Sequence, residues 1–291
     1  YIWELASGEQ LAQLDHRNVY GLSFSPDGQT LATAGWDRAV RFWQARTGDP
    51  VSVHQVAKAA DDNGGDDTRM YTVCYSPDGE TIATAHLSGD VRVWNVTSMK
   101  LINQFKLPGR FIYGAMAYSP AGMWLATGAM NGDVSVWDPS NGQPVWNRGK
   151  HASYVYTVGF ASDGLTLLTG GNDGLGYLWD LRPTNPQDLK EVDSQMEALC
   201  SKDSRIAFEA MAVMAMAPDR VVNTLAGLTT QLSEGQDIEN QADAATIARR
   251  ATALLAQVGT PQARLLLKGW SSQNPESALA EAATKALTRL Q

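Results

Sequence analysis

The sequence predicts a repeated all-β fold over residues 1–184, followed by an all-α region, and three observations support this prediction. Tryptophan recurs at intervals of 40, 51, 43 and 42 residues, at Trp3, Trp43, Trp94, Trp137 and Trp179. Nineteen residues before each of the last four stands an aromatic residue that opens a turn: Phe24, Tyr75, Tyr118 or Phe160. The first 185 residues hold 22 of the 26 glycines, whereas the last 106 hold 20 alanines and four glycines. A fixed period of this length marks supersecondary units that pack on their neighbours.

Each repeat contains four short runs of alternating apolar and polar residues, separated by turn residues, which is the pattern of β-strands. Pro26-Asp27-Gly28 closes the second run of the first complete repeat, because proline presets one turn dihedral and glycine accepts a positive one. Tyr1–Glu4 predicts one strand of an earlier repeat. The four runs of the first complete repeat are predicted at Leu11–Asp15, Val19–Ser25, Thr30–Gly35 and Val40–Gln44.

Fixed polar positions accompany the periodic tryptophans. Ten residues before each of the last four stands a threonine: Thr33, Thr84, Thr127 or Thr169. Six residues before each stands a small polar residue: Asp37, Ser88, Asn131 or Asp173. Together with His16, His151 and the dipeptides Trp137-Asp138 and Trp179-Asp180, these residues resemble the WD-repeat family. The resemblance implies a β-propeller in which each repeat supplies one four-stranded blade.

In that family, His, Ser or Thr, Asp and Trp of one blade form a buried hydrogen-bonded chain. The resemblance therefore implies two complete structural networks, one of His16, Thr33, Asp37 and Trp43, the other of His151, Thr169, Asp173 and Trp179. The blades ending at Trp94 and Trp137 lack the histidine, so weaker networks are expected there. Recurrence at the same offsets in two blades favours this structural interpretation over a hydrolase triad.

The number of repeats predicts an incomplete, open arc of about four and a half blades, since propellers close with 4–8 blades. A blade of the WD-repeat family takes its outermost strand from the start of the next repeat, and no strand pattern follows Trp179. No signal peptide or initiator Met is visible, and Tyr1 falls inside a predicted strand. We therefore expect that the missing N-terminal blades belong to the same full-length protein.

An all-α domain is predicted over residues 193–291, after a linker at 185–192 that contains Pro186. About six helices are expected. Pro218 and Pro261 should each begin a helix, and Asn274-Pro275-Glu276 should cap the last one. Paired Ala- and Leu-rich helices resemble HEAT-like helical repeats. Large bacterial WD-repeat proteins, some fused to kinase or sigma-factor domains, carry a similar extension after the last blade.

One face of the propeller is predicted to bind a partner. It carries the loops that enter the innermost strands and the turns before the third strands, and the WD-repeat family commonly uses it. Trp, Tyr, Arg and Met dominate binding energy at interfaces, and Trp36 in a tight turn is hard to explain by folding alone. The alternative is that these side chains pack between blades. The expected partner-binding residues are Asn18, Tyr20, Trp36, Arg69, Tyr71, Leu87, Met130, Tyr154, Tyr156 and Asn172.

Two further groups of charged residues are interpreted as solvated. The acidic loop 61–67 could hold a hard cation, but Asp66 and Thr72 occupy the positions where an EF-hand needs Gly and Glu. Arg249, Arg250, Arg264 and Lys268 are expected on a solvated helix face. Cys74 and Cys200 fall in different predicted domains and indicate lone core residues.

The formal net charge of −8 argues against nucleic acid and anionic membranes as partners, and no apolar run is long enough to span a bilayer. The leading hypothesis is a non-catalytic scaffold that binds a protein or peptide, with no cofactor and no metal. One alternative is a C-terminal regulatory or localisation module of a larger enzyme or signalling protein. A quinoprotein-like propeller enzyme is a third, although its docking motif occurs once, at 139–146. The compartment stays open, with the cytoplasm slightly favoured.

Overall fold

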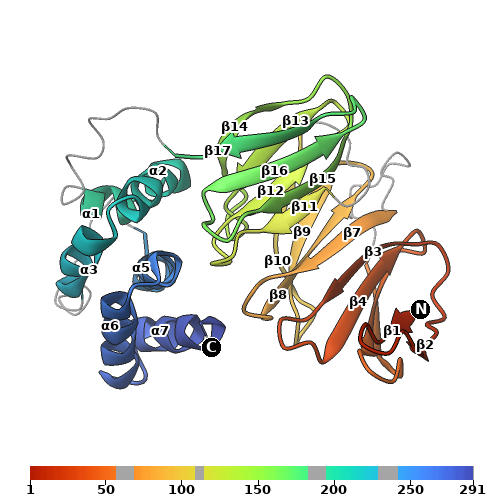
Figure 1. The fold of residues 1–291 in the computed structure, drawn as a ribbon, viewed down its shortest axis with the longest axis horizontal. Coiled ribbons are helices and arrows are strands. Elements are labelled where there is room, and N and C mark those ends of the chain that lie inside the picture. The colour runs from red at the N-terminus through yellow and green to blue at the C-terminus, as the bar shows by residue number, and fades with distance from the viewer. Residues whose placement is uncertain (57–68, 109–114, 183–194, 229–241, 291) are drawn as a thin grey trace.

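The computed structural model describes residues 1–56, 69–108, 115–182, 195–228 and 242–290. Figure 1 shows a fan of β-sheets, ordered along the chain, and a group of helices at one side of the fan. The predicted linker at 185–192 and the acidic loop 61–67 lie outside the described residues.

Four blades form a β-propeller arrangement, as the repeats predict, and a two-stranded sheet precedes them. The two-stranded sheet consists of β1 (Ile2–Trp3) and β2 (Gln10–Ala12). The first blade consists of β3 (Val19–Phe24), β4 (Thr30–Gly35), β5 (Ala39–Gln44) and β6 (Pro50–Gln55). The second consists of β7 (Met70–Tyr75), β8 (Thr81–His86), β9 (Asp90–Asn95) and β10 (Leu101–Lys106). The third consists of β11 (Met116–Tyr118), β12 (Leu125–Gly128), β13 (Asp133–Trp137) and β14 (Pro144–Lys150). The fourth consists of β15 (Val155–Phe160), β16 (Thr166–Gly171) and β17 (Gly176–Asp180).

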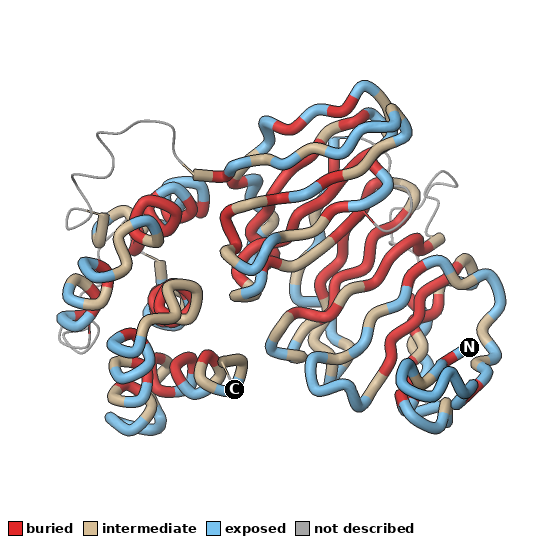
Figure 2. The backbone as a smooth tube through the Cα atoms, in the orientation of Figure 1, coloured by how far each residue is buried: buried red, intermediate tan, exposed pale blue. Residues whose placement is uncertain are grey.

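Every blade is an antiparallel meander, and successive blades pack through their inner strands: β3 on β7, β7 on β11, and β11 on β15. The strands β4, β8 and β12 are buried on both faces because each lies between two neighbouring sheets, as the buried stretches in Figure 2 show. Ala32, Ala34 and Phe42 of the first blade share one core with Val73 and Ile82 of the second. The sequence of β4, mostly apolar and small, follows from this two-sided burial.

The outward faces of the first and fourth blades expose large apolar side chains. Leu22 and Phe24 on β3 are 64% and 50% exposed. Leu168 and Leu178 pair across β16 and β17 and are 53% and 74% exposed. Interior blades bury the equivalent surfaces against a neighbour, so these two faces have the composition of an interface between blades.

The six described helices form the remainder: α1 (Gln195–Leu199), α2 (Ser204–Ala215), α3 (Pro218–Ala226), α5 (Ala244–Val258), α6 (Pro261–Ser272) and α7 (Ala278–Arg289). Pro218 and Pro261 begin helices as predicted. The predicted cap of the last helix is wrong by three residues. Ser277 is the N-cap of α7, and its hydroxyl accepts from the Ala280 amide, whereas Asn274 lies before the helix with a φ of 42°. The likeness to HEAT-like repeats stays a prediction.

Arg250 contradicts the prediction of a solvated basic face. Its side chain is almost fully buried, and its Nη1 donates to the carbonyl oxygens of Leu199 and Ser201, 2.9 and 2.6 Å away. Burial lowers its pKa below the ordinary arginine value. Arg250 therefore fixes the end of α1 against α5, while its neighbour Arg249 is exposed.

The helices contact the propeller at the end of the blades that carries the glycine turns between the first and second strands. Lys285 on α7 pairs with Glu80, Arg289 donates to the Ala121 carbonyl, and Gln257 on α5 donates to the Asp163 carbonyl. Trp124 and Phe208 meet edge to face, 5.1 Å apart, inside one core that spans both parts. The helices thus cover one end of three successive blades and leave the opposite end for the predicted partner-binding residues.

Candidate functional site

A hydrogen-bonded chain stabilises the first blade from inside. Trp43 Nε1 donates to Thr33 Oγ1 at 2.8 Å, and Thr33 Oγ1 lies 2.8 Å from His16 Nδ1. His16 Nε2 lies 3.1 Å from Asp37 Oδ1. Because a carboxylate only accepts, Nε2 carries the proton and Nδ1 accepts from the Thr33 hydroxyl. Burial lowers the pKa of His16, and hydrogen bonds from Arg41 and His16 outweigh burial to lower the pKa of Asp37.

The fourth blade repeats this chain. Trp179 Nε1 donates to Thr169 Oγ1 at 2.8 Å, and His151 lies between Thr169 Oγ1 at 2.7 Å and Asp173 Oδ2 at 2.9 Å. His151 is buried, and the Ala152 amide also donates to the Asp173 carboxylate. These groups bond one another inside the blade, which gives them a structural role and leaves the rim residues as the candidate site.

The second blade contains a histidine partner that the offset rule missed. Thr84 Oγ1 accepts from Trp94 Nε1 at 3.0 Å and lies 3.2 Å from Nε2 of the buried His86. His86 comes from β8 itself, two residues after Thr84, instead of from the loop before the first strand. The histidine at the family's offset is absent from this blade, as expected, and His86 lies beside Thr84 in its place. In the third blade Thr127 accepts from Trp137 Nε1 at 2.8 Å.

Backbone hydrogen bonds form the rim at the end of the blades opposite the helices. The Trp36 amide donates to the Asn18 carbonyl, the Leu87 amide to the Arg69 carbonyl, and the Asn172 amide to the Tyr154 carbonyl. Each bond joins the loop that enters a blade to the turn before its third strand. Gly35 permits the first, since a Cβ there would lie 2.5 Å from the Asn18 oxygen.

Four of the predicted residues meet where the first and second blades join. Tyr20 stacks on Trp36 with ring centroids 4.9 Å apart, and Tyr71 lies 5.2 Å from Tyr20 and 6.1 Å from Trp36. The guanidinium carbon of Arg69 lies 4.8 Å above the Trp36 ring. Aromatic stacking and a cation–π contact hold this rim cluster in one arrangement. The rim cluster is Tyr20, Trp36, Arg69 and Tyr71.

The remaining predicted residues lie elsewhere on the rim. Tyr156 on β15 donates to Asn172 Oδ1, and the Asn172 amide nitrogen donates to Ser153 Oγ. Leu87 is half-buried and packs on the main core, and Met130 is also half-buried. Asn18 has a positive φ of 55°, so its backbone shapes the turn. The structure therefore separates the predicted set into the rim cluster, a group on the fourth blade and individual rim positions. The group on the fourth blade is Tyr154, Tyr156 and Asn172.

The aromatic side chains of the rim cluster differ in exposure. Tyr20 is 39% exposed, while Tyr71 is buried and supports it from below. Trp36 Nε1 is buried with no acceptor among the described residues, an arrangement that costs about 1–3 kcal/mol. The described residues contain no group of three or more His, Cys, Asp or Glu that could hold a metal ion. None of the described helices has the length and apolar character needed to cross a membrane.

Each blade contains a Trp–Thr hydrogen bond, and successive blades pack side by side. These two features define a class of protein, the repeat propellers. The family model described as "WD domain, G-beta repeat" matches residues 8–44, 63–95, 106–138 and 142–180. The four repeats of this chain therefore belong to the WD-repeat family.

Several known proteins are similar to this chain. Periodic tryptophan protein 2 of Saccharomyces cerevisiae is 22% identical over 62% of this chain and 16% of its own length. Human transducin beta-like protein 3 is 32% identical over 68% of this chain and 24% of its own length. The matched region thus spans less than a quarter of these two relatives. The crystal structure of the computationally designed protein Ika4 is similar to 60% of this chain over 99% of its own length, with a TM-score of 0.47 and a sequence identity of 21%.

Proposed function

We propose that this chain is a non-catalytic interaction module that binds a protein or peptide at the rim. The observation that carries the proposal is the rim cluster, because its rings are ordered before any partner arrives. Preordered aromatic side chains lose little conformational entropy on binding, so more of their contact energy contributes to affinity. The propeller serves as the rigid support, and the helices add a second surface.

The group on the fourth blade extends the same surface. Tyr154 and Tyr156 are 38% and 40% exposed, and the hydrogen bond from Tyr156 to Asn172 orients one of the two rings. Leu87 and Met130 lie on the intervening blades, at the turns equivalent to Trp36 and Asn172. We propose that a partner contacts both groups of aromatic residues, with the intervening rim excluding water from the contact.

We further propose that additional blades of the same protein continue the arc. The exposed leucines on the outward faces of the first and fourth blades support this, since a neighbouring blade would bury them. The small part of each relative that the chain matches is also compatible with a longer protein. In that setting the chain would act as a regulatory or localisation module of the whole protein.

Substitution of one residue from each group tests the rim. The full chain is immobilised, and the partner that it captures from an extract of its own cells is identified and quantified. Trp36→Ala with Tyr156→Ala should reduce that capture at least tenfold without lowering the Tm by more than a few degrees. Tyr1→Ala with Leu265→Ala is the matched control, because both side chains are exposed and lie outside the rim. Unchanged capture by the rim variant would refute the proposed surface.

A further inference from the structure

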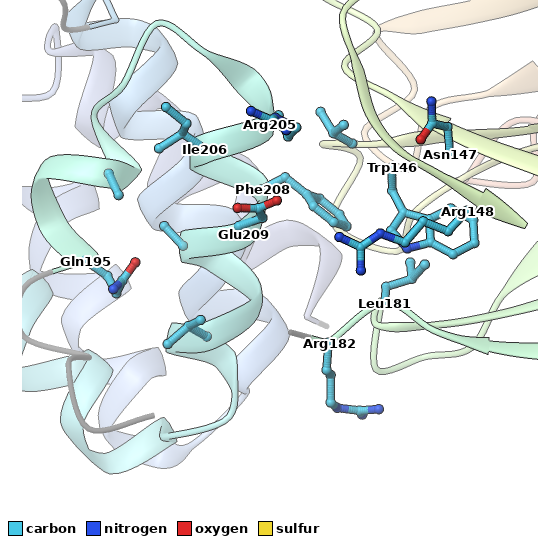
Figure 3. Close-up of a pocket in the computed structure, with 14 residues that line it drawn as sticks. Trp146, Asn147, Arg148, Leu181, Arg182, Gln195, Arg205, Ile206, Phe208 and Glu209 are labelled. Atoms are coloured by element: carbon cyan, nitrogen blue, oxygen red, sulfur yellow. The ribbon is translucent and has the colours of Figure 1, made fainter. Parts of the chain in front are cut away.

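A groove of about 480 Å³ lies between the propeller and the helices, away from the rim. One wall is the outermost strand of the third blade, β14, and the other is helix α2; the end of the fourth blade completes it (Figure 3). Its volume falls within the range of sites that bind small molecules or short peptide segments. Its lining residues include Trp146, Arg148, Leu181, Arg205, Phe208 and Glu209.

The floor of the groove is apolar and rigid. Phe208, Leu181 and Val213 are buried and belong to the core that joins the two parts of the chain. Trp146 is half-buried on β14 and meets the ring of Trp179 edge to face at 6.1 Å. Ile206 on α2 is 41% exposed. An apolar side chain entering the groove beside Trp146 would therefore contact apolar residues that are already in place, Leu181 and Phe208.

Two arginines of the groove carry charge that the described residues do not neutralise. Arg148 and Arg205 are exposed, and neither side chain makes a hydrogen bond or ion pair with a described residue. Arg182 differs, because it pairs with Asp163 at 2.8 Å and Asp180 at 3.0 Å. In Figure 3 the Arg148 side chain extends from β14 toward α2, and Arg182 points away from it.

Glu209 on α2 is the acidic residue among the lining residues, and it also lacks an ion pair within the described part of the chain. Two unpaired arginines against one glutamate leave one net positive charge, on a chain whose formal charge is −8. A local positive site on an acidic protein favours an anionic ligand of limited charge. A polyanion such as nucleic acid would meet repulsion from Glu209 and from the chain as a whole.

We propose that this groove binds a short segment of a partner protein in which an aspartate or glutamate adjoins a large apolar side chain. The carboxylate pairs with the fork of Arg148, assisted by Arg205, and the apolar side chain lies against Trp146, Leu181 and Phe208. Arginine matches a carboxylate with two parallel hydrogen bonds, which gives orientation as well as attraction. The two unpaired arginines and the apolar floor of the groove together define this chemistry.

The groove is independent of the rim proposed above. It lies beside α2, whose first turn is bonded to the turn after Trp137, at the opposite end of the blades from Trp36. Substitutions in the groove should leave capture at the rim unchanged, and substitutions at the rim should leave the groove unchanged. Failure of one proposal is therefore distinguishable from failure of the other.

Fluorescence anisotropy of the purified full chain tests the groove. The probes are fluorescein-labelled hexapeptides with Asp-Leu, Asp-Phe, Glu-Leu or Glu-Phe at the centre of an alanine and glycine frame. Matched peptides carry Asn, Gln or phosphoserine in place of the acid. At least one acidic peptide should bind tenfold more tightly than its amide counterpart, since a charge-assisted hydrogen bond contributes more than a neutral one.

Arginine variants then locate the bound peptide. Arg148→Gln with Arg205→Gln should weaken binding of the acidic peptide at least tenfold, and Arg148→Lys should give an intermediate loss because it keeps the charge without the fork. Arg46→Gln with Arg264→Gln is the control of equal charge, and it should bind within twofold of the parent chain. Equal affinity for acid and amide, or equal binding by the groove and control variants, would overturn the proposal. Preference for phosphoserine would replace the carboxylate assignment with a phosphoryl one.

Discussion

Ser204 Oγ on the first turn of α2 donates a 2.7 Å hydrogen bond to Asp138 Oδ2, the aspartate of a Trp-Asp dipeptide in the third blade. Both side chains are buried, at 0% and 2% exposure. Asn141 Nδ2 donates to the same hydroxyl, and the Ser204 amide donates to Gln143 Oε1. A propeller turn and a helix N-terminus thus satisfy each other's polar groups, which joins the helical part to the third blade.

Replacing Ser204 should loosen this junction. Ser204→Ala removes the hydroxyl that donates to the Asp138 carboxylate, and loss of a buried hydrogen bond to a charged group costs about 1–3 kcal/mol. Urea unfolding of the full chain measures the loss, with Ser272→Ala as the control because Ser272 is exposed and its hydroxyl donates to carbonyls of its own helix. A stability equal to that of the control variant would contradict an energetic role for the junction.

Two threonines with different partners should differ in their contribution to stability. Thr127→Val leaves Trp137 Nε1 without its acceptor and should cost about 1–3 kcal/mol. Thr33→Val removes the partner of both Trp43 Nε1 and His16, so it should cost roughly 1 kcal/mol more. Chemical unfolding of both variants measures the difference. Equal losses would show that the His16 contact adds no net stability.

His16 should make stability depend on pH. Burial lowers its pKa below the ordinary value of 6.5, so the folded chain binds fewer protons than the unfolded chain just below that pH. The stabilisation that neutral His16 contributes to the folded chain is complete above pH 6.5. It declines as the pH falls toward the pKa of His16 in the folded chain, and below that pKa the stability no longer changes through His16. The lowered pKa of Asp37 acts separately, because its contribution is lost below pH 3.8.

Urea midpoints between about pH 7.5 and pH 5 test this dependence. His16→Asn should be less stable than the parent chain at the upper pH, and the gap between the two should narrow as the pH falls. The comparison of the two chains cancels the other histidines. A gap that stays constant across this range would exclude His16 as the titrating group.

Arg250 and Arg249 form a matched pair of neighbours on α5. Arg250→Met leaves the Leu199 and Ser201 carbonyls without their donor and should destabilise the chain by about 2–4 kcal/mol. Arg249→Met changes an exposed side chain and should stay within about 0.5 kcal/mol of the parent. Thermal or urea unfolding separates the two. Similar values for both variants would mean that Arg250 packs without stabilising the end of α1.

The outward faces of the first and fourth blades should promote self-association when the chain is produced alone. Leu22→Lys with Leu178→Lys places charge on both exposed apolar faces and should shift the chain toward the monomer. Sedimentation velocity over a range of concentrations measures the change, with Leu265→Lys on α6 as a control at an exposed leucine outside the arc. Concentration-independent sedimentation of the parent chain would argue against these faces as interfaces.

The period of the repeats predicted much of the fold because each repeat carries the same local pattern of apolar residues and turn residues. Thr30–Gly35 was predicted to the residue, since its alternation and flanking turns are local. The caps at Pro218 and Pro261 are local signals of the same kind. His86 escaped the offset rule because a buried side chain two residues away on the same strand can reach Thr84 as well as a distant loop can.

The sequence by itself determined the blades, their periodic tryptophans and the helical character of the remainder, because these follow from short-range spacing of apolar, turn and capping residues. The tertiary structure decided which residues meet across repeats: Tyr20 and Trp36 with Arg69 and Tyr71, Ser204 with Asp138, and Arg148 facing α2. It also decided that Arg250 is buried while Arg249 is exposed, although both lie on one helix. The physical reason is that contacts between distant segments depend on how the blades and helices pack, and no local pattern in the chain encodes that packing.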